Sequence, residues 1–206
     1  MRDSVQQKST RDAILDATDN LLARYGYRKM TIDDLAAEAG IGKGTVYLYF
    51  PSKEEIALSH IDRIIERLKA RLWAIAHKDN SPEEKIRRML VERVIFRFDS
   101  VQHYSQSLNE LLAQIRPKLL DRRKRYFNEE AQIFAKVITN GKDAGAFDVR
   151  NAADAAQTLL YATNSLLPYS LSTQELGDRK EIARRSAAIA ETCLSGLMSR
   201  GETANK

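Results

Sequence analysis

The spacing of apolar residues along the chain predicts helices from the first segment onward. Between Ser9 and Tyr25 apolar residues recur three or four positions apart, which places them on one face of an α-helix. Ser9 or Thr10 can cap the amino-terminal end of this helix, because a hydroxyl oxygen accepts a hydrogen bond from a free backbone N–H group. Gly26 is expected to end the helix.

Two short helices are expected next. Thr31 can cap a helix over 31–39, with acidic residues following at the positive end of the helix dipole. Gly40 closes this helix, and a second short helix is expected over about 43–50.

The rest of the chain continues the helical pattern. Ser52 and Ser81 are expected to cap long helices, and Pro82 suits the first helical position. Breaks are expected at Pro117 and in the glycine-containing turn 141–145. The sequence shows no alternation typical of strands and no internal repeat. The further helices are expected at about 52–77, 82–98, 103–115, 117–140, 151–167 and 179–199.

Composition narrows the class of protein. A chain of 206 residues is long enough to bury a sizeable core, and its net charge of +5 is compatible with a polyanionic partner. The single cysteine, Cys193, cannot form an internal disulfide, and the three histidines show no metal-ligand spacing. A charged amino-terminal stretch and the lack of a run of roughly twenty apolar residues predict a cytoplasmic protein.

The sequence GIGKGTVYLYFPSKEE at 40–55 carries the clearest functional signal. A helix over 31–39, a tight turn and a second helix over 43–50 form a helix-turn-helix. In this motif the second helix lies in the major groove of DNA. The sequence therefore predicts a nucleic-acid-binding segment near the amino-terminal end.

The two edges of the second short helix predict different roles. On a wheel of about 100° per residue, Val46 and Phe50 share one edge, which can pack against the preceding helices. Lys43 and Tyr47 lie together on another edge. The apolar edge is expected to anchor the helix, and the other edge is expected to contact DNA.

Two glycines lie at the amino-terminal end of this helix. At Gly42 and Gly44 the absence of a side chain would let the backbone approach phosphates or base edges closely. A glycine inside a helix costs about 1 kcal/mol relative to alanine, which tertiary packing can offset. Close approach to the duplex is the expected gain.

Residues 13–56, AILDATDNLLARYGYRKMTIDDLAAEAGIGKGTVYLYFPSKEEI, resemble the amino-terminal domain of the TetR family of bacterial transcriptional repressors. The shared pattern is a Thr-started helix, an Ala-Gly turn, a Gly-Thr-aliphatic-Tyr recognition helix, an aromatic pair ending in Phe, and a Ser-Lys-Glu start to the fourth helix. Gly42 departs from the family, which often has serine there, and Tyr49 stands where the family often has histidine.

The resemblance implies a set of DNA contacts. Lys43 and Gly44 would face base edges, and Thr45, Tyr47, Tyr49, Lys53 and Thr31 would hold the phosphate backbone. Lysine can reach the acceptors of guanine in the major groove, so Lys43 is the expected reader of sequence. Simpler roles stay open: the two tyrosines as aromatic core, Thr31 as a helix cap only, and Lys53 as a solvated lysine.

From about Ser52 onward only the all-helical layout resembles the family. The expected fold is all-α with about nine helices: a helix-turn-helix DNA-binding domain at 1–51, joined by a long helix to a ligand-binding and dimerisation domain at 52–206. The family layout implies an effector pocket among the middle helices and a two-fold interface on the last two long helices.

Two apolar stripes are expected to form the dimer interface. The alternative is that both stripes pack inside their own subunit. The residues of the stripes are Leu159, Leu160, Thr163 and Leu167, and Ala183, Ala187, Ala190, Leu194 and Leu197.

Polar and aromatic residues on the middle helices are candidates for the effector pocket. Each of them could instead belong to the core or to a helix edge. A buried arginine without a partner would be unfavourable, so an acidic effector is the hypothesis that follows if Arg93 or Arg97 faces inward. The candidates are Arg93, Phe96, Arg97, His103, Tyr104, Tyr126, Phe127, Phe134 and Asn164.

These features predict a homodimeric transcriptional regulator that binds a palindromic operator and is released by a small-molecule effector. The resemblance favours repression over activation. No catalytic residues, metal ligands or cofactor are expected, because the chain lacks a nucleophile elbow, acid–base pairs, metal spacing and a phosphate loop. An activator of the same fold, or a helical enzyme or ligand carrier without DNA binding, is the alternative.

Overall fold

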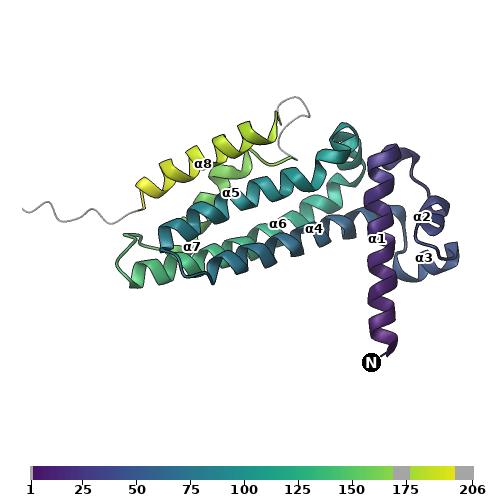
Figure 1. The fold of residues 1–206 in the computed structure, drawn as a ribbon, viewed down its shortest axis with the longest axis horizontal. Helices are drawn as coiled ribbons and strands as arrows, with labels where there is room; N and C mark the ends of the chain where they lie inside the picture. Colours follow the sequence, from purple (N-terminus) through teal and green to yellow (C-terminus); the bar gives the residue numbers. More distant parts are fainter. Residues whose placement is uncertain (1, 169–176, 198–206) are drawn as a thin grey trace, which may run out of the picture. The chain divides into compact units, whose positions relative to one another are not determined.

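The computed structural model describes residues 2–168 and 177–197, and its regular structure in these ranges is helical (Figure 1). The expected all-α class is confirmed, with eight α-helices and one 3₁₀ helix among the described residues. The helices are α1 (Arg2–Lys29), α2 (Ile32–Glu38), α3 (Lys43–Tyr49), α4 (Lys53–Ala76), α5 (Pro82–Val101), η1 (Gln102–Tyr104), α6 (Ser105–Asp143), α7 (Ala152–Asn164) and α8 (Arg179–Ser195).

Local capping signals fix several of these helix ends. Gly26 interrupts α1 with a φ of 74°, and one further turn leads to Lys29. The Ser52 hydroxyl accepts a hydrogen bond from the backbone N–H of Glu55 at 3.1 Å, as expected for a helix cap. The Ser81 hydroxyl does the same for a backbone N–H in the first turn of α5. Helix α1 begins at Arg2, earlier than the sequence predicts.

Pro117 does not break the chain into two helices. The expected helices 103–115 and 117–140 form one helix, α6, with Pro117 inside it. A proline leaves the carbonyl four residues earlier without its helical partner, and this carbonyl belongs to Ala113. Both residues are exposed, so water can hydrate the carbonyl. Buried side chains on both sides, such as Ile115 and Tyr126, hold the helix together across the proline.

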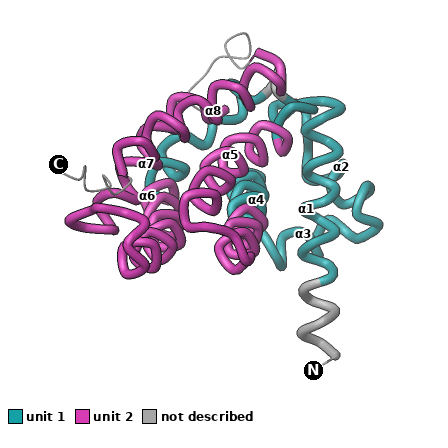
Figure 2. Tube along the Cα trace, turned by 60° about the vertical axis from the view of Figure 1, so that its left-hand side comes forward, with its two compact units in different colours: residues 1–65, 101–121 teal, residues 66–100, 122–206 magenta. Residues whose placement is uncertain are grey.

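The chain divides into two compact units, drawn in different colours in Figure 2. The first comprises Met1–Ile65 and Val101–Asp121, and the second comprises Glu66–Ser100 and Arg122–Lys206. The long helices α4 and α6 contribute residues to both. The predicted domains at 1–51 and 52–206 are two continuous stretches of the chain, whereas each compact unit combines two separate stretches. The predicted domain boundary stays a prediction. Among the described residues, no helix is both long and apolar enough to cross a membrane.

Each unit has its own apolar core. The core of the first unit joins residues of α1 to α4 with residues from η1 and the start of α6, including Leu15, Leu35 and Leu111. The core of the second unit joins α4 to α8, and Leu72 and Phe134 are fully buried there. Burial of each such side chain stabilises the fold by about 1.5–3 kcal/mol relative to exposure.

Gly141 shows how tightly the second unit is packed. A Cβ atom at this position would lie 2.5 Å from the Phe147 ring and 2.9 Å from Cβ of Pro82. Atoms of both neighbours would have to move, because distances this short are repulsive. The glycine therefore lets the end of α6 meet Phe147 directly.

We expect Gly141→Ala to lower the free energy of unfolding by roughly 1–3 kcal/mol, the usual range for overpacking a core. Urea unfolding of the full chain would measure the change. Gly44→Ala is the matched control, because no atom lies within 4 Å of a Cβ built at Gly44. Equal stability of Gly141→Ala and the wild type would contradict the tight packing described for this position.

Candidate nucleic-acid interface

Helices α2 and α3 form the predicted helix-turn-helix within the first unit. The Thr31 hydroxyl accepts a hydrogen bond from the Asp34 backbone N–H at 3.1 Å, and the Asp34 carboxylate accepts one from the Thr31 N–H at 3.0 Å. The Thr31 hydroxyl also donates to the Asp34 carboxylate at 2.7 Å, and this hydrogen bond, with the one from the Thr31 N–H, holds the pKa of Asp34 below its usual value. Together they cap α2 reciprocally, so the expected capping role of Thr31 is confirmed.

The turn between the two helices has one defined geometry. Gly40 has a φ of 67°, which a side chain would strain. The Ile41 N–H donates to the Ala36 carbonyl at 2.9 Å, and the Gly40 N–H donates to the Ala37 carbonyl at 3.2 Å. This pair of hydrogen bonds is the Schellman motif, which ends α2 and sets the direction in which the chain enters α3.

One edge of α3 is buried, as its pattern predicts. Val46 is 0% exposed and Phe50, which follows the helix directly, is 1% exposed. The guanidinium of Arg11 on α1 lies 5.1 Å from the centre of the Phe50 ring, which adds a cation–π contact to the apolar packing. In Figure 1, α2 and α3 lie next to each other on one side of α1.

A polar clamp holds α2 against α1. The Arg24 guanidinium donates hydrogen bonds of 2.9 and 3.1 Å to the two carboxylate oxygens of Glu38, and the Asn20 amide donates one of 3.0 Å. A bidentate arginine–carboxylate pair fixes both distance and orientation. The clamp therefore positions the helix on which α3 rests.

The opposite face of α3 is open. Lys43, Gly44, Tyr47 and Leu48 are all exposed, and Tyr47 keeps 49% of its surface accessible. Space around Gly44 is empty, since a Cβ built there meets nothing within 4 Å. Neither packing nor a positive φ requires a glycine at position 44. We shall call these four residues the outer face of α3.

Lys43, the expected reader of base sequence, is paired in the free protein. Its ammonium group lies 2.9 Å from an Asp33 carboxylate oxygen at the start of α2. Hydrogen bonding to Asp33 and its charge raise the pKa of Lys43, so the side chain is charged near neutral pH. The ion pair is exposed and holds the lysine at the edge of the outer face.

Thr45 and Tyr49 lie at the borders of the outer face. Both are half-buried, and Tyr49 packs against the core of the first unit. Tyr49 therefore combines an aromatic core role with an accessible part, and the phosphate contacts expected of both residues stay predictions.

Lys53 has a structural role that its sequence position did not predict. Its ammonium group donates hydrogen bonds to the carbonyls of Tyr27, Arg28 and Met30 at 2.9, 3.3 and 3.0 Å. It also lies 4.5 Å from the centre of the Tyr27 ring. Desolvation lowers the pKa of this lysine. A phosphate contact, which stays a prediction, would compete with these carbonyls for the same ammonium group.

Leu48 was missed by the sequence analysis. It is 84% exposed, the largest exposed fraction among the bulky apolar side chains that the structure describes. The available signal was its spacing, because Leu48 follows Gly44 by one helical turn and so shares the outer face.

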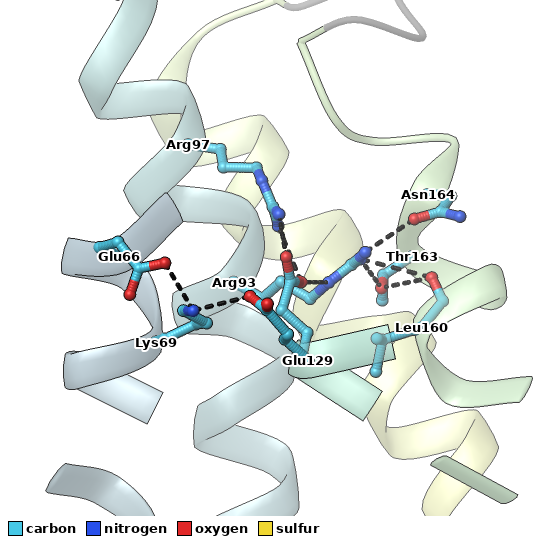
Figure 3. A network of polar contacts seen from close by, with 9 residues as sticks. Glu66, Lys69, Arg93, Arg97, Glu129, Leu160, Thr163 and Asn164 are labelled. Carbon is cyan, nitrogen blue, oxygen red and sulfur yellow. Dashed lines mark hydrogen bonds and ion pairs between the residues drawn. The ribbon is translucent and has the colours of Figure 1, made fainter. Parts of the chain in front are cut away.

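In the second unit, two of the pocket candidates meet at a buried carboxylate. The Glu130 side chain is 0% exposed and accepts hydrogen bonds from the guanidinium groups of both Arg93 and Arg97. Arg93 donates further to the Thr163 hydroxyl at 2.8 Å and to the Asn164 amide oxygen at 2.8 Å (Figure 3). This network ties α5, α6 and α7 together.

The network corrects the premise of the acidic-effector hypothesis. That hypothesis required a buried arginine without a partner, and Arg93 and Arg97 share the carboxylate of Glu130. Burial by itself raises the pKa of Glu130, but the charges and hydrogen bonds of Arg97 and Arg93 outweigh it and hold the pKa below the usual value. Glu130 was not among the predicted site residues, although it lies one turn before the buried Phe134.

The remaining pocket candidates are not gathered at one place. Tyr126 and Phe134 are buried, and Phe96 and Phe127 are half-buried, all in the second unit. The others, His103 and Tyr104, belong to the first unit.

An aspartate of α1 links these two residues to the helix-turn-helix end. His103 Nε2 lies 3.1 Å from an Asp19 carboxylate oxygen, and the Tyr104 hydroxyl lies 3.4 Å from His60 Nε2. Desolvation and the charge of Asp19 raise the pKa of Tyr104. These residues therefore connect η1 with α1 and α4 inside the first unit.

Most of the predicted interface residues pack inside their own subunit, which was the alternative reading of both stripes. Small and apolar residues at helical spacing serve an internal core as well as an interface, and here the core takes them. Ala183 and Leu197 are half-buried, and Ala187 is exposed. The buried residues, which are not available to a second copy, are Leu159, Leu160, Thr163, Leu167, Ala190 and Leu194.

Comparison with known proteins identifies the helix-turn-helix end. Residues 14–59 match the family of bacterial regulatory proteins described as the tetR family. This amino-terminal segment is therefore a TetR-family helix-turn-helix domain. The matched span runs from α1 through α3 into α4, so it contains the outer face of α3 and the residues that anchor it. Curated relatives that match part of the chain are named HTH-type transcriptional regulators.

Two curated relatives differ in how much of the chain they match. An uncharacterized HTH-type transcriptional regulator of Lactococcus lactis is 36% identical over 84 residues, which are 40% of this chain and 43% of that protein. The chain therefore spans less than half of that relative. The fatty acid metabolism regulator protein of Bacillus subtilis is 24% identical over 190 residues, which are 89% of this chain and 93% of that protein.

Solved structures share the fold. The transcriptional regulator FadR from Bacillus subtilis, crystallised in complex with stearoyl-CoA, superposes with a TM-score of 0.65. The match covers 89% of this chain and 97% of that one at 19% sequence identity. The similarity therefore demonstrates a common fold and nothing more.

We expect Glu130→Gln to lower the free energy of unfolding by roughly 3–5 kcal/mol, because two buried guanidinium groups would lose the carboxylate charge that they share. The midpoint of urea unfolding at fixed protein concentration would measure this loss. Glu129→Gln is the control: Glu129 pairs with Lys69 at 2.7 Å but is 34% exposed, so its removal should cost about 1 kcal/mol or less.

The same pair gives a pH dependence with a defined sign. Because the folded-state pKa of Glu130 is lowered, its contribution is present above the unfolded value of about 4.3 and is lost as the pH falls through the folded value. Wild-type protein should therefore lose more stability on acidification than Glu130→Gln. Equal losses of stability in the two carboxylate variants at neutral pH would contradict the buried network.

Proposed function

We propose that this protein is a homodimeric repressor of the TetR family. It binds a palindromic operator with α3 in the major groove and leaves the operator when a small-molecule effector binds. The observation that carries the proposal is the outer face of α3, which is exposed, contains a glycine that the fold does not require, and has a lysine at its edge.

The glycine supports close contact with a large, rigid partner. Inside a protein, a helical glycine is usually explained by a neighbour that leaves no room for a Cβ atom, and Gly44 has no such neighbour. Its cost to α3 therefore points to something outside the chain that approaches the backbone. The groove of a duplex, entered by a helix, makes such an approach.

Dimerisation follows from the size of the reading element. Helix α3 has only seven residues, so a single copy reaches few base pairs. Two copies related by a two-fold axis would place two α3 helices about 34–36 Å apart on successive turns of B-DNA, which requires a palindromic site. Exposed faces of α7 and α8, with Tyr161 and Ala187 among their residues, are the available surface for pairing in the second unit.

The effector class to test first is a long-chain acyl-CoA. A curated relative that matches 89% of this chain is a fatty acid metabolism regulator, and a structure with the same fold was crystallised with stearoyl-CoA. The satisfied Arg93–Glu130–Arg97 network gives no separate reason for a small acidic ligand.

The direct test is fluorescence anisotropy of the full chain with labelled duplex from its own upstream region. We expect tight binding that stearoyl-CoA weakens by roughly 5–150-fold, the usual range of allosteric coupling, whereas coenzyme A and stearate added separately do not. Retained DNA binding at saturating stearoyl-CoA would contradict the effector class alone. Absence of DNA binding at low salt would contradict the proposed function itself. Higher reporter expression without the regulator indicates repression, and lower expression indicates activation.

We expect Gly44→Ala to have opposite effects on folding and on DNA binding. Stability should rise by roughly 0.5–1 kcal/mol, because alanine is the better helix former and meets no atom of the chain. Affinity for the operator should fall about tenfold, or about 1.4 kcal/mol, because the added methyl group holds α3 away from the duplex. Urea unfolding and anisotropy would measure the two effects.

A matched control is Gly196→Ala, which adds the same methyl group at an exposed glycine at the end of α8. Operator affinity should be unchanged in this variant. If Gly44→Ala bound DNA as tightly as the wild type, the outer face of α3 would not be the contact surface.

A further inference from the structure

Leu48 lacks a structural explanation within the chain. It is 84% exposed, compared with 49% for Leu120, the other leucine among the exposed bulky apolar residues. Two residues before it in α3, Val46 is completely buried, and Phe50, directly after the helix, is 1% exposed. The short helix thus has an apolar edge inside the fold and a second apolar group facing outward.

Leu48 and Gly44 form one feature. They are four residues apart and lie on the same strip of α3, one turn above the other. Side chains on a helix lean toward its amino-terminal end, so Leu48 leans over the turn that contains Gly44. No atom lies within 4 Å of a Cβ built at Gly44, so the strip of α3 beside Leu48 is open to an approaching molecule.

We infer that Leu48 recognises the C5-methyl group of a thymine in each half of the operator. This inference rests on the proposed function, since it requires α3 to lie in the major groove. Thymine carries the apolar group of the major-groove edge, and every other distinguishing feature there is a hydrogen-bond donor or acceptor. A leucine gains by contact with the methyl group and would desolvate donors and acceptors without replacing their hydrogen bonds.

The polar neighbours of Leu48 are expected to make different contacts with DNA than Leu48 itself. Lys43 and Tyr47 supply a charged donor and a hydroxyl on the same outer face, which suits guanine acceptors and phosphate oxygens. Leu48 supplies no hydrogen bond, so it cannot hold the backbone. Its contribution is therefore to choice among base pairs, which Lys43 alone was expected to provide.

A protein partner fits the same residues less well. The outer face is one side of a seven-residue helix with a glycine in its first turn, and its edge carries a lysine. Apolar contact with a protein requires a broader patch, because stable interfaces bury roughly 800 Å² on each partner. DNA requires only one methyl group opposite Leu48.

The test begins with an operator selected from a random duplex library by the full-length wild-type protein. Each thymine of the operator is then replaced singly by deoxyuridine, which removes the methyl group and keeps the base pair. We expect one thymine in each half-site at which this replacement weakens wild-type binding about fourfold, the effect of one buried methyl group. In Leu48→Ala the same replacement should have no effect, because the contact is already absent.

Two controls isolate the contact. Leu120→Ala removes another exposed leucine and should keep the full sensitivity to deoxyuridine. Replacing the sensitive T·A pair by C·G should weaken wild-type binding, and 5-methylcytosine at that position should recover about fourfold in the wild type but not in Leu48→Ala. Leu48 is exposed, so its substitution leaves the core untouched.

The outcomes separate the two levels of the proposal. If the protein binds its operator but no thymine shows the effect, or if Leu48→Ala keeps the same sensitivity, the inference is overturned and Leu48 is left to contact a protein. If no sequence is enriched from the library at all, both the inference and the proposed function fail.

Discussion

One-sided burial of α3 is the constraint on which the proposed DNA recognition depends. A helix of seven residues is too short to be stable alone, since isolated helices need about 12–15 residues to form in water. Val46 and Phe50 supply the missing stability by packing into the core of the first unit. Because they occupy one edge only, the outer face of α3 stays exposed. The same packing that makes α3 a helix therefore decides which of its side chains can meet another molecule.

Local signals in the sequence were sufficient for much of the fold. Capping by Thr31 and Ser52 and the interruption at Gly26 depend on a few neighbouring residues, so they could be predicted from the sequence. Pro117 was misjudged because helix continuation there depends on packing at both sides of the proline, which local propensity does not contain. The anchoring edge of α3 was predictable, because Val46 and Phe50 are apolar, lie one turn apart and can be buried together on one side of a short helix.

Sites that depend on tertiary contacts were predicted less well. Leu160 and Thr163 have the spacing of an interface stripe, but the same spacing serves an internal core, and periodicity alone does not separate the two. Glu130 was not recognised as a buried partner, because the two arginines that it pairs with are 33 and 37 residues away in the sequence. The structural role of Lys53 was not predicted either. Its carbonyl partners, at the end of α1 and directly after it, are 23 to 26 residues earlier in the sequence.

The hydrogen bonds from Lys53 to α1 also restrict how the helix-turn-helix can move relative to the start of α4. Lys53, the first residue of α4, is hydrogen-bonded to the Tyr27 and Arg28 carbonyls near the end of α1, so these two helix ends are tied directly to each other. A rotation of α4 would carry α1 with it, and α1 in turn holds α2 through the clamp on Glu38. Helices α1 to α3 and the first turn of α4 are therefore expected to move together as one rigid group.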